Sequence, residues 1–171
     1  MSSNYREVYN FETYCNKFRF ATYHEQIRLC LGCKPKSILV IGPGDHIVPV
    51  VLQHLLPKAI VDTFDIRDGS TYKGDLREIS NIVTDKYDCI LCCEVLEHIE
   101  FEYFEYIIEQ LKNICNKSLI ISVPKFNGKL CVYHKWEVGY KVAEKDIISI
   151  IGKSTITWID NKIMFITYER Q

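Results

Sequence analysis

The sequence lacks the features that would place the protein in a membrane or direct it out of the cell. No run approaches the roughly 18 consecutive apolar residues of a membrane-spanning helix. The N-terminal stretch MSSNYREVYN is polar and has no apolar core of a secretory signal peptide. We therefore expect a cytoplasmic protein that has no membrane partner.

A charge excess of either sign is also missing. The 171 residues carry 21 Lys and Arg against 22 Asp and Glu, a formal net charge of −1. Nucleic acids attract proteins through clustered positive charge, so the overall balance does not favour such a partner. The sequence has no internal repeats or low-complexity tracts, and its length suits one domain. We expect a single domain over 1–171, with a helical segment at 1–34 and an α/β core at 35–171.

Cysteine, in contrast, is abundant. Most of the thiols lie in or beside apolar runs, and no export signal leads to an oxidising compartment, so we expect them to be reduced. Cys30 and Cys33 have the spacing of half a zinc site, but no second pair at suitable spacing accompanies them. The eight residues are Cys15, Cys30, Cys33, Cys89, Cys92, Cys93, Cys115 and Cys131.

Short apolar runs alternate with amphipathic stretches along most of the chain. This alternation is typical of a parallel sheet covered by helices on both faces, a three-layer α/β fold. Two β-rich runs on either side of Asp160-Asn161 predict a closing antiparallel hairpin. Strands are predicted at 37–41, 59–66, 87–93 and 118–124, with a short one within 71–76, and helices within 7–32, at 47–56 and at 101–115.

Three features follow successive predicted strands. Gly42, Pro43 and Gly44 come after the first, and such a turn lets the backbone approach a ligand without side-chain obstruction. Asp65 ends the second strand about 20 residues later, where a carboxylate can bind ribose hydroxyls. Asp75 follows the third strand and could accept a hydrogen bond from an exocyclic amine. Because ligands bind beyond the carboxyl ends of parallel strands, this ordered set predicts an adenosine-type cofactor.

With the stretch EVLEH at 94–98, this set resembles the class I S-adenosylmethionine (SAM)-dependent methyltransferases over about residues 37–125. The resemblance implies a Rossmann-like methyltransferase fold: a mostly parallel seven-stranded sheet with an antiparallel C-terminal hairpin. It also implies SAM as the cofactor. The cofactor-binding residues that it implies are Gly42, Pro43, Gly44, Asp65, Ile66, Asp75, Leu76, Cys92, Cys93 and Glu94.

Two positions depart from the family's pattern. Val40 stands where an acidic residue is frequent, and His46 takes the place of a third glycine. One alternative is therefore a non-catalytic SAM-binding subunit that stabilises a catalytic partner. A nicotinamide enzyme is not indicated, because its G-x-G-x-x-G turn would require glycine at Ile47.

The residues after the fourth strand leave three interpretations open. If a helical turn begins there, Glu94, Glu97 and His98 share one face. They could cap neighbouring loops, or His98 or His134 could remove the proton of a methyl acceptor. We take Glu97, His98 and His134 as the candidate catalytic residues. Resemblance to relatives with a Glu-x-x-Glu-His motif implies a third interpretation, a divalent metal held by Glu94, Glu97, His98 and His134.

The sequence thus predicts a SAM-dependent methyltransferase that methylates oxygen, with N-methylation as the less favoured alternative. A small-molecule, glycan or polymer-end acceptor is expected, with residues 125–144 forming most of its site. An alternative is a metal-dependent RNA ribose methyltransferase, which the near-neutral charge opposes. No particular oligomeric state is predicted.

Overall fold

The computed structural model of the protein describes residues 16–126, 129–132 and 140–170. None of the helices in these ranges is long and apolar enough to cross a membrane. The strands are β1 (Ser37–Ile41), β2 (Ile60–Asp65), β3 (Tyr72–Lys73), β4 (Tyr87–Cys93), β5 (Cys115–Phe126), β6 (Lys129–Val132), β7 (Tyr140–Val142), β8 (Ser154–Ile159) and β9 (Ile163–Glu169). The helices are α3 (Lys17–Gly32), α4 (Ile47–Leu55), α5 (Ile79–Ile82), α6 (Phe104–Ile114) and α7 (Glu144–Ile151), with single 3-10 turns η1 (Leu76–Glu78), η2 (Leu96–His98) and η3 (Phe101–Tyr103).

The main sheet has one reversed strand. Its order is β3-β2-β1-β4-β5-β9-β8, and each pair from β3 to β5 is parallel. The strand β9 runs antiparallel between β5 and β8, so the reversal lies one place in from the edge. A small antiparallel extension, β6 and β7, continues from the end of β5. The predicted mostly parallel sheet with an antiparallel C-terminal hairpin is confirmed.

The hairpin turn shows why Asp160 and Asn161 were informative. Both residues adopt left-handed backbone angles, with φ of +48° and +51°. A two-residue turn of this hand matches the right-handed twist of the flanking strands, and Asp and Asn tolerate the conformation better than most residues.

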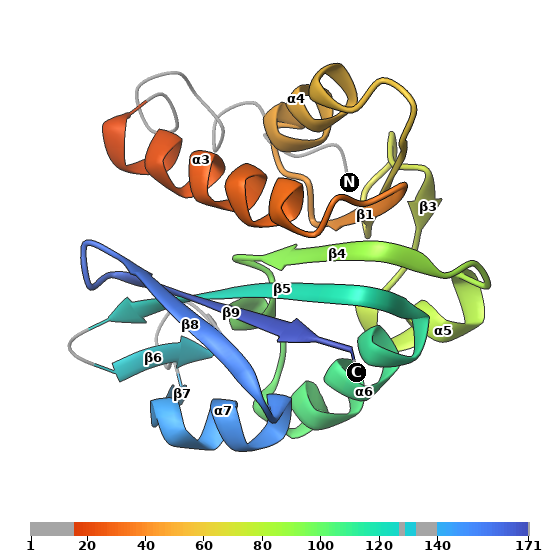
Figure 1. The fold of residues 1–171 in the computed structure, drawn as a ribbon. Coiled ribbons are helices and arrows are strands. Elements are labelled where there is room, and N and C mark those ends of the chain that lie inside the picture. Colours follow the sequence, from red (N-terminus) through yellow and green to blue (C-terminus); the bar gives the residue numbers. More distant parts are fainter. Residues whose placement is uncertain (1–15, 127–128, 133–139, 171) are drawn as a thin grey trace.

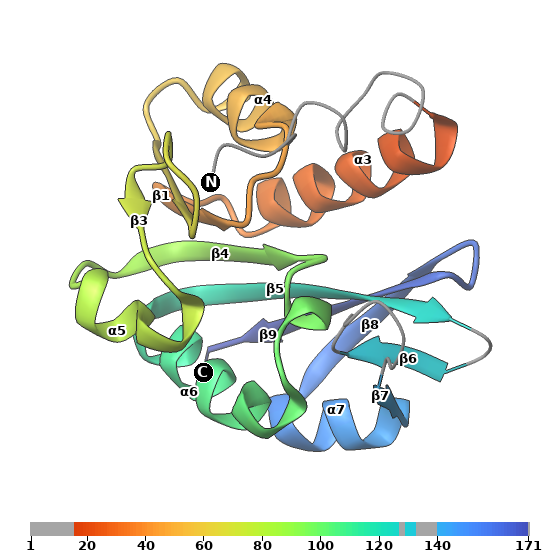
Figure 2. The same cartoon turned by 180° about the vertical axis from the view of Figure 1, so that it is seen from behind.

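Alternate residues of the central strands pack on opposite faces of the sheet. Ile38 and Val40 belong to the apolar cluster with α3 and α4, whereas Leu39 and Ile41 belong to the one with α5, α6 and α7. The two helix layers are visible above and below the sheet in Figure 1, and from behind in Figure 2. Burial on both faces explains why the strands are continuous apolar runs, and the predicted three-layer arrangement is confirmed.

Several element boundaries differ from the predicted ones. The stretch predicted as one helix over 101–115 begins with η3, and Cys115 already has the extended backbone that starts β5. The third strand is only two residues long. It ends there because the Asp75 carboxylate accepts the amide hydrogen bond of Arg77 and starts η1.

Candidate functional site

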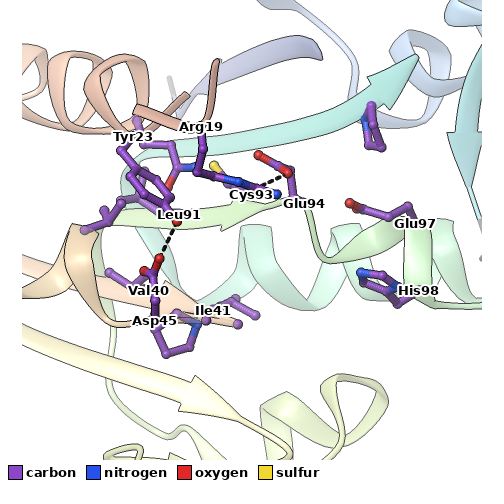
Figure 3. Close-up of a pocket in the computed structure, with 16 residues that line it drawn as sticks. Arg19, Tyr23, Val40, Ile41, Asp45, Leu91, Cys93, Glu94, Glu97 and His98 are labelled. Carbon is purple, nitrogen blue, oxygen red and sulfur yellow. Dashed lines mark hydrogen bonds and ion pairs between the residues drawn. The ribbon is translucent and has the colours of Figure 1, made fainter. Parts of the chain in front are cut away.

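A cavity of about 330 Å³ opens at the carboxyl ends of β1 and β4, against the N-terminal half of α3 (Figure 3). Its walls come from α3, from the loop after β1 and from the residues that follow β4. The volume lies in the range of small-molecule and cofactor sites. The structure thus places a ligand-sized cavity at the sheet edge where the sequence predicts one.

The turn after β1 depends on glycine. Gly42 and Gly44 have φ of +60° and +59°, in the left-handed region that side chains disfavour. A Cβ atom added to Gly42 would lie 2.5 Å from Cγ2 of Val95. His46, the residue in place of a third glycine, also has a positive φ of +62°, which costs about 1–2 kcal/mol. The backbone at Gly42 and Gly44 is therefore open to the cavity.

Two polar contacts hold α3 over the cavity (Figure 3). Arg19 Nη1 lies 2.5 Å from Glu94 Oε2, which joins the first turn of α3 to the end of β4. The Tyr23 hydroxyl donates to Asp45 Oδ2 at 2.5 Å. Burial and the adjacent Asp45 carboxylate raise the pKa of Tyr23, so its hydroxyl stays protonated. Tyr23, Gln26 and Asp45 line the cavity but are not among the predicted site residues.

Glu97 is a buried carboxyl that faces the cavity. Its residue is 4% exposed, and within the described ranges its Oε2 has no hydrogen-bond partner. Oε1 of Glu94 is likewise buried without a partner there. Burial, assisted by the nearby Glu94, raises the pKa of Glu97 well above its ordinary value. The raised pKa favours the protonated form of Glu97, which can donate a hydrogen bond to a ligand.

The raised pKa of Glu97 makes the stability of the fold depend on pH. The unfolded chain releases this proton above about pH 4.5, whereas the folded chain retains it, so stability falls as the pH rises towards the folded pKa. Each tenfold difference in proton affinity between the folded and unfolded states changes the free energy of unfolding by about 1.4 kcal/mol. We expect the stability gain of Glu97→Gln over the parent to grow from pH 5 to pH 8, as measured by urea unfolding. The control is Glu102→Gln at an exposed position, for which the difference in unfolding free energy from the parent should not change with pH. A difference for Glu97→Gln that also stays constant with pH would contradict this expectation.

The expected helical face after β4 forms only in part. Glu94 has a left-handed φ of +56°, which ends the strand, and the turn η2 starts two residues later. Glu94 therefore precedes the turn instead of sharing a helical face with Glu97 and His98. All three nevertheless line the cavity, with His98 exposed at its rim (Figure 3). His134 lies outside the described residues.

The contacts of the described residues give no additional support to the interpretation of a metal site. Within residues 16–126, 129–132 and 140–170, no three His, Cys, Asp or Glu side chains are placed to hold an ion. One oxygen of Glu94 is engaged by Arg19. The metal site of Glu94, Glu97, His98 and His134 thus stays a prediction, and no chemical step below depends on it.

Each of the two predicted adenosine-binding carboxylates is paired with an arginine two residues later. Arg67 Nε donates to Asp65 Oδ1 at 2.8 Å, and its Nη2 donates to Oδ2 at 2.5 Å. Arg77 binds Asp75 in the same way, at 2.9 and 2.5 Å, and lowers the pKa of Asp75. The repeated pattern D-x-R, in DIR at 65–67 and DLR at 75–77, is the sequence signal that could have revealed these pairs.

The other predicted cofactor-binding residues are divided between surface and core. Ile66 is 66% exposed beside Asp65, and Cys93 lines the cavity. Leu76 and Cys92 are buried in the apolar cluster on the α6 side of the sheet, so neither side chain borders the cavity. Cys92 is directed away because successive residues of β4 point to opposite faces.

Comparison with known proteins identifies the fold. No protein-family model matches the sequence, and no curated protein matches it significantly. The structure resembles magnesium protoporphyrin IX methyltransferase from Synechocystis PCC 6803 with bound SAM, at 16% identity and a TM-score of 0.68, over 98% of this chain and 89% of that one. It also resembles the N-methyltransferase NodS from Bradyrhizobium japonicum WM9, at 13% identity and a TM-score of 0.61, over 90% of this chain and 97% of NodS. The third similar structure is TehB from Haemophilus influenzae, at 15% identity and a TM-score of 0.69, over 97% of this chain and 67% of TehB. The chain thus has the predicted fold of class I SAM-dependent methyltransferases.

Proposed function

We propose that the chain is a SAM-dependent methyltransferase that methylates an oxygen of a small-molecule, glycan or polymer-end acceptor. The observation that carries this proposal is the cavity at the Gly42–Gly44 turn, lined by Glu94 and Glu97, each of which has one buried oxygen without a hydrogen-bond partner among the described residues. In this fold, ligands bind beyond the carboxyl ends of the strands, where this cavity lies. The Synechocystis enzyme of the same fold was solved with SAM bound.

The residues present fit this cofactor. The open backbone at Gly42 and Gly44 would lie under its methionine part, and Asp65 would accept hydrogen bonds from its ribose hydroxyls. Asp75 would accept from the adenine amine, with the exposed Ile66 beside the ring. When bound, SAM supplies an electrophilic methyl group on a sulfonium, which is the hard part of the chemistry.

The residues around η2 have separate tasks on the acceptor side. His98 is exposed at the rim, where its imidazole can take the acceptor's hydroxyl proton. Glu97, whose raised pKa favours the protonated form, can donate a hydrogen bond that orients the ligand in the cavity. The backbone of β6 lies beside η2, so the β6 segment borders the place where the acceptor would bind.

Binding of S-adenosylhomocysteine (SAH), followed by labelled methyl transfer, tests the proposal. Calorimetry on the full chain is expected to show one SAH site, and Gly42→Ala should weaken it at least tenfold because the new Cβ meets Val95 and strains the turn. Gly32→Ala, whose Cβ meets nothing within 4 Å, should bind as the parent does. Methyl transfer from labelled SAM is then measured against panels of hydroxylated and amine acceptors.

Two results would count against this function. Absence of SAH and SAM binding at millimolar ligand would remove the cofactor assignment. Tight binding without transfer to any hydroxylated acceptor, combined with transfer to amines, would replace O-methylation by N-methylation.

A further inference from the structure

One wall of the cavity carries a positive and a negative side chain next to each other. The helix α3 contributes Arg19, Tyr23 and Gln26 to this wall, and their spacing of four and three residues places them on one face of the helix. Arg19 Nη1 lies 2.5 Å from Glu94 Oε2, and Figure 3 shows this pair beside the bond between Tyr23 and Asp45. The side chains of Arg19 and Glu94 are only 26% and 17% exposed. A ligand that reaches this wall therefore meets a cation and an anion together, both largely shielded from water.

Glu94 is the anion of this wall that still has an open oxygen. The acidic residues that line the cavity within the described ranges are Asp45, Glu94 and Glu97. Both oxygens of Asp45 are engaged, because Oδ2 accepts from the Tyr23 hydroxyl and Oδ1 accepts from the backbone N–H of Ile47 at 3.1 Å. Glu94 Oε1, in contrast, is buried without a hydrogen-bond partner among the described residues. A ligand that donates to Oε1 removes the cost of this unsatisfied acceptor.

Arg19 can bind an anionic group of the same ligand. A guanidinium carries five N–H donors in a planar fork, and this fork matches the two oxygens of a carboxylate. The ion pair with Glu94 is made through Nη1, at the edge of the fork. The wall thus offers donors for a carboxylate and an acceptor for a cation within a few ångströms. An α-amino acid group is complementary to it, because its carboxylate and its ammonium are attached to the same carbon.

We propose that Arg19 and Glu94 form the binding site for the amino-acid end of the cofactor. Arg19 binds the α-carboxylate, and Glu94 Oε1 accepts a hydrogen bond from the α-ammonium. The inference rests on the proposed function and adds Arg19 of α3 to the residues that hold SAM and SAH. Because Arg19 belongs to α3 and Glu94 follows β4, the amino-acid end also joins the helix to the sheet edge. An adenosine derivative without that end cannot make this connection.

Truncated ligands test the role of Arg19 on the full chain. Calorimetry compares SAH with decarboxylated SAH, which keeps the ammonium, and with 5′-methylthioadenosine, which lacks both charged groups. Arg19→Ala is expected to weaken SAH binding about 10- to 150-fold, as for lost hydrogen bonds to a charged group. It should leave the affinity for 5′-methylthioadenosine unchanged. Decarboxylated SAH should bind Arg19→Ala at least as tightly as the parent, because its ammonium then meets Glu94 without the repulsion of the guanidinium.

Glu94→Gln tests the other half of the site with the same three ligands. The amide keeps the shape of the side chain but removes its negative charge. SAH and decarboxylated SAH both carry the ammonium, so both are expected to bind this variant more weakly than the parent. The affinity for 5′-methylthioadenosine should again stay unchanged. A Glu94→Gln variant that binds all three ligands as the parent does would overturn the assignment of the ammonium.

Two further substitutions of arginine on α3 complete the experiment. Arg28→Ala removes an exposed guanidinium that pairs with Glu25 outside the cavity, and it should leave all three affinities unchanged. Arg19→Lys keeps the charge without the planar fork, so its loss of SAH affinity should be smaller and again specific to ligands with a carboxylate. This variant decides the matter if Arg19→Ala does not fold.

The ligand series also separates this inference from the proposed function. Equal losses of SAH and 5′-methylthioadenosine in the folded Arg19 variant would mean that Arg19 only holds α3 in place. That result would overturn the amino-acid site and leave the proposed function intact. Absence of SAH binding to the parent chain would instead overturn the proposed function, and this site with it.

Discussion

Asp65→Ala is expected to weaken SAH binding by about 1.5–3 kcal/mol, roughly 10- to 150-fold in Kd, because it removes hydrogen bonds between a carboxylate and the ribose. Asp65 is 7% exposed at the end of β2. In the variant, water therefore cannot readily replace the lost carboxylate as the partner of the ribose hydroxyls. Calorimetric titration of the folded variant measures the effect. An unchanged Kd would show that the ribose hydroxyls bind elsewhere.

Two neighbouring substitutions serve as controls for Asp65. Asp68→Ala removes a fully solvated carboxylate of the same loop, which pairs only with exposed Lys73 among the described residues, and should leave SAH affinity unchanged. Arg67→Ala removes the guanidinium that occupies both oxygens of Asp65. It should bind SAH at least as tightly as the parent, because the ligand no longer has to displace that pair.

His98→Ala is expected to lower the rate of methyl transfer by about 10²- to 10⁴-fold, the usual contribution of a general base. SAH affinity should stay within about twofold of the parent, because an exposed residue at the rim contributes little to holding the cofactor. The measurement pairs single-turnover transfer from labelled SAM with SAH calorimetry. His54→Ala, at an exposed position of α4 that does not line the cavity, should leave both quantities unchanged.

The pH dependence of the transfer rate distinguishes a catalytic role of His98 from a merely structural one. A base whose pKa is near neutral makes the parent rate rise with pH through that range, and the residual rate of His98→Ala should lose this rise. Equal losses in transfer rate and SAH affinity, with the pH profile retained, would instead mean that His98 only supports the loop after β4. The same paired readout applies to Glu97→Ala and His134→Ala, for which we expect a reduced transfer rate at nearly unchanged affinity.

The sheet could be predicted because its signals are local. Each central strand is a continuous apolar run that is buried on both faces, and Asp160-Asn161 favours the turn that closes the hairpin. The order of Gly42, Gly44 and Asp65 along the chain carries over directly to the sheet edge, because parallel strands end on the same side. This edge is where the structure places the cavity.

The contacts that shape the cavity depend on tertiary context instead. The helix α3 has no clear apolar stripe, and its buried residues include Thr22, Tyr23 and Gln26. Its position over β4 could not be read from periodicity. The left-handed backbone of Glu94 is equally hidden, since glutamate has no preference for that region. A helical face was therefore expected where the chain instead makes a sharp bend.

The place of β9 in the sheet has a consequence for how the protein folds as it is synthesised. Seven residue pairs join β9 to β5, and β9 is also the strand through which β8 reaches the rest of the sheet. Until residues 163–169 have left the ribosome, β5 has its β4 partner but an open edge on the other side. An unpaired apolar edge is a template for intermolecular strand pairing. The nascent chain is therefore exposed to aggregation until β9 docks, and stalling within the hairpin would prolong that state.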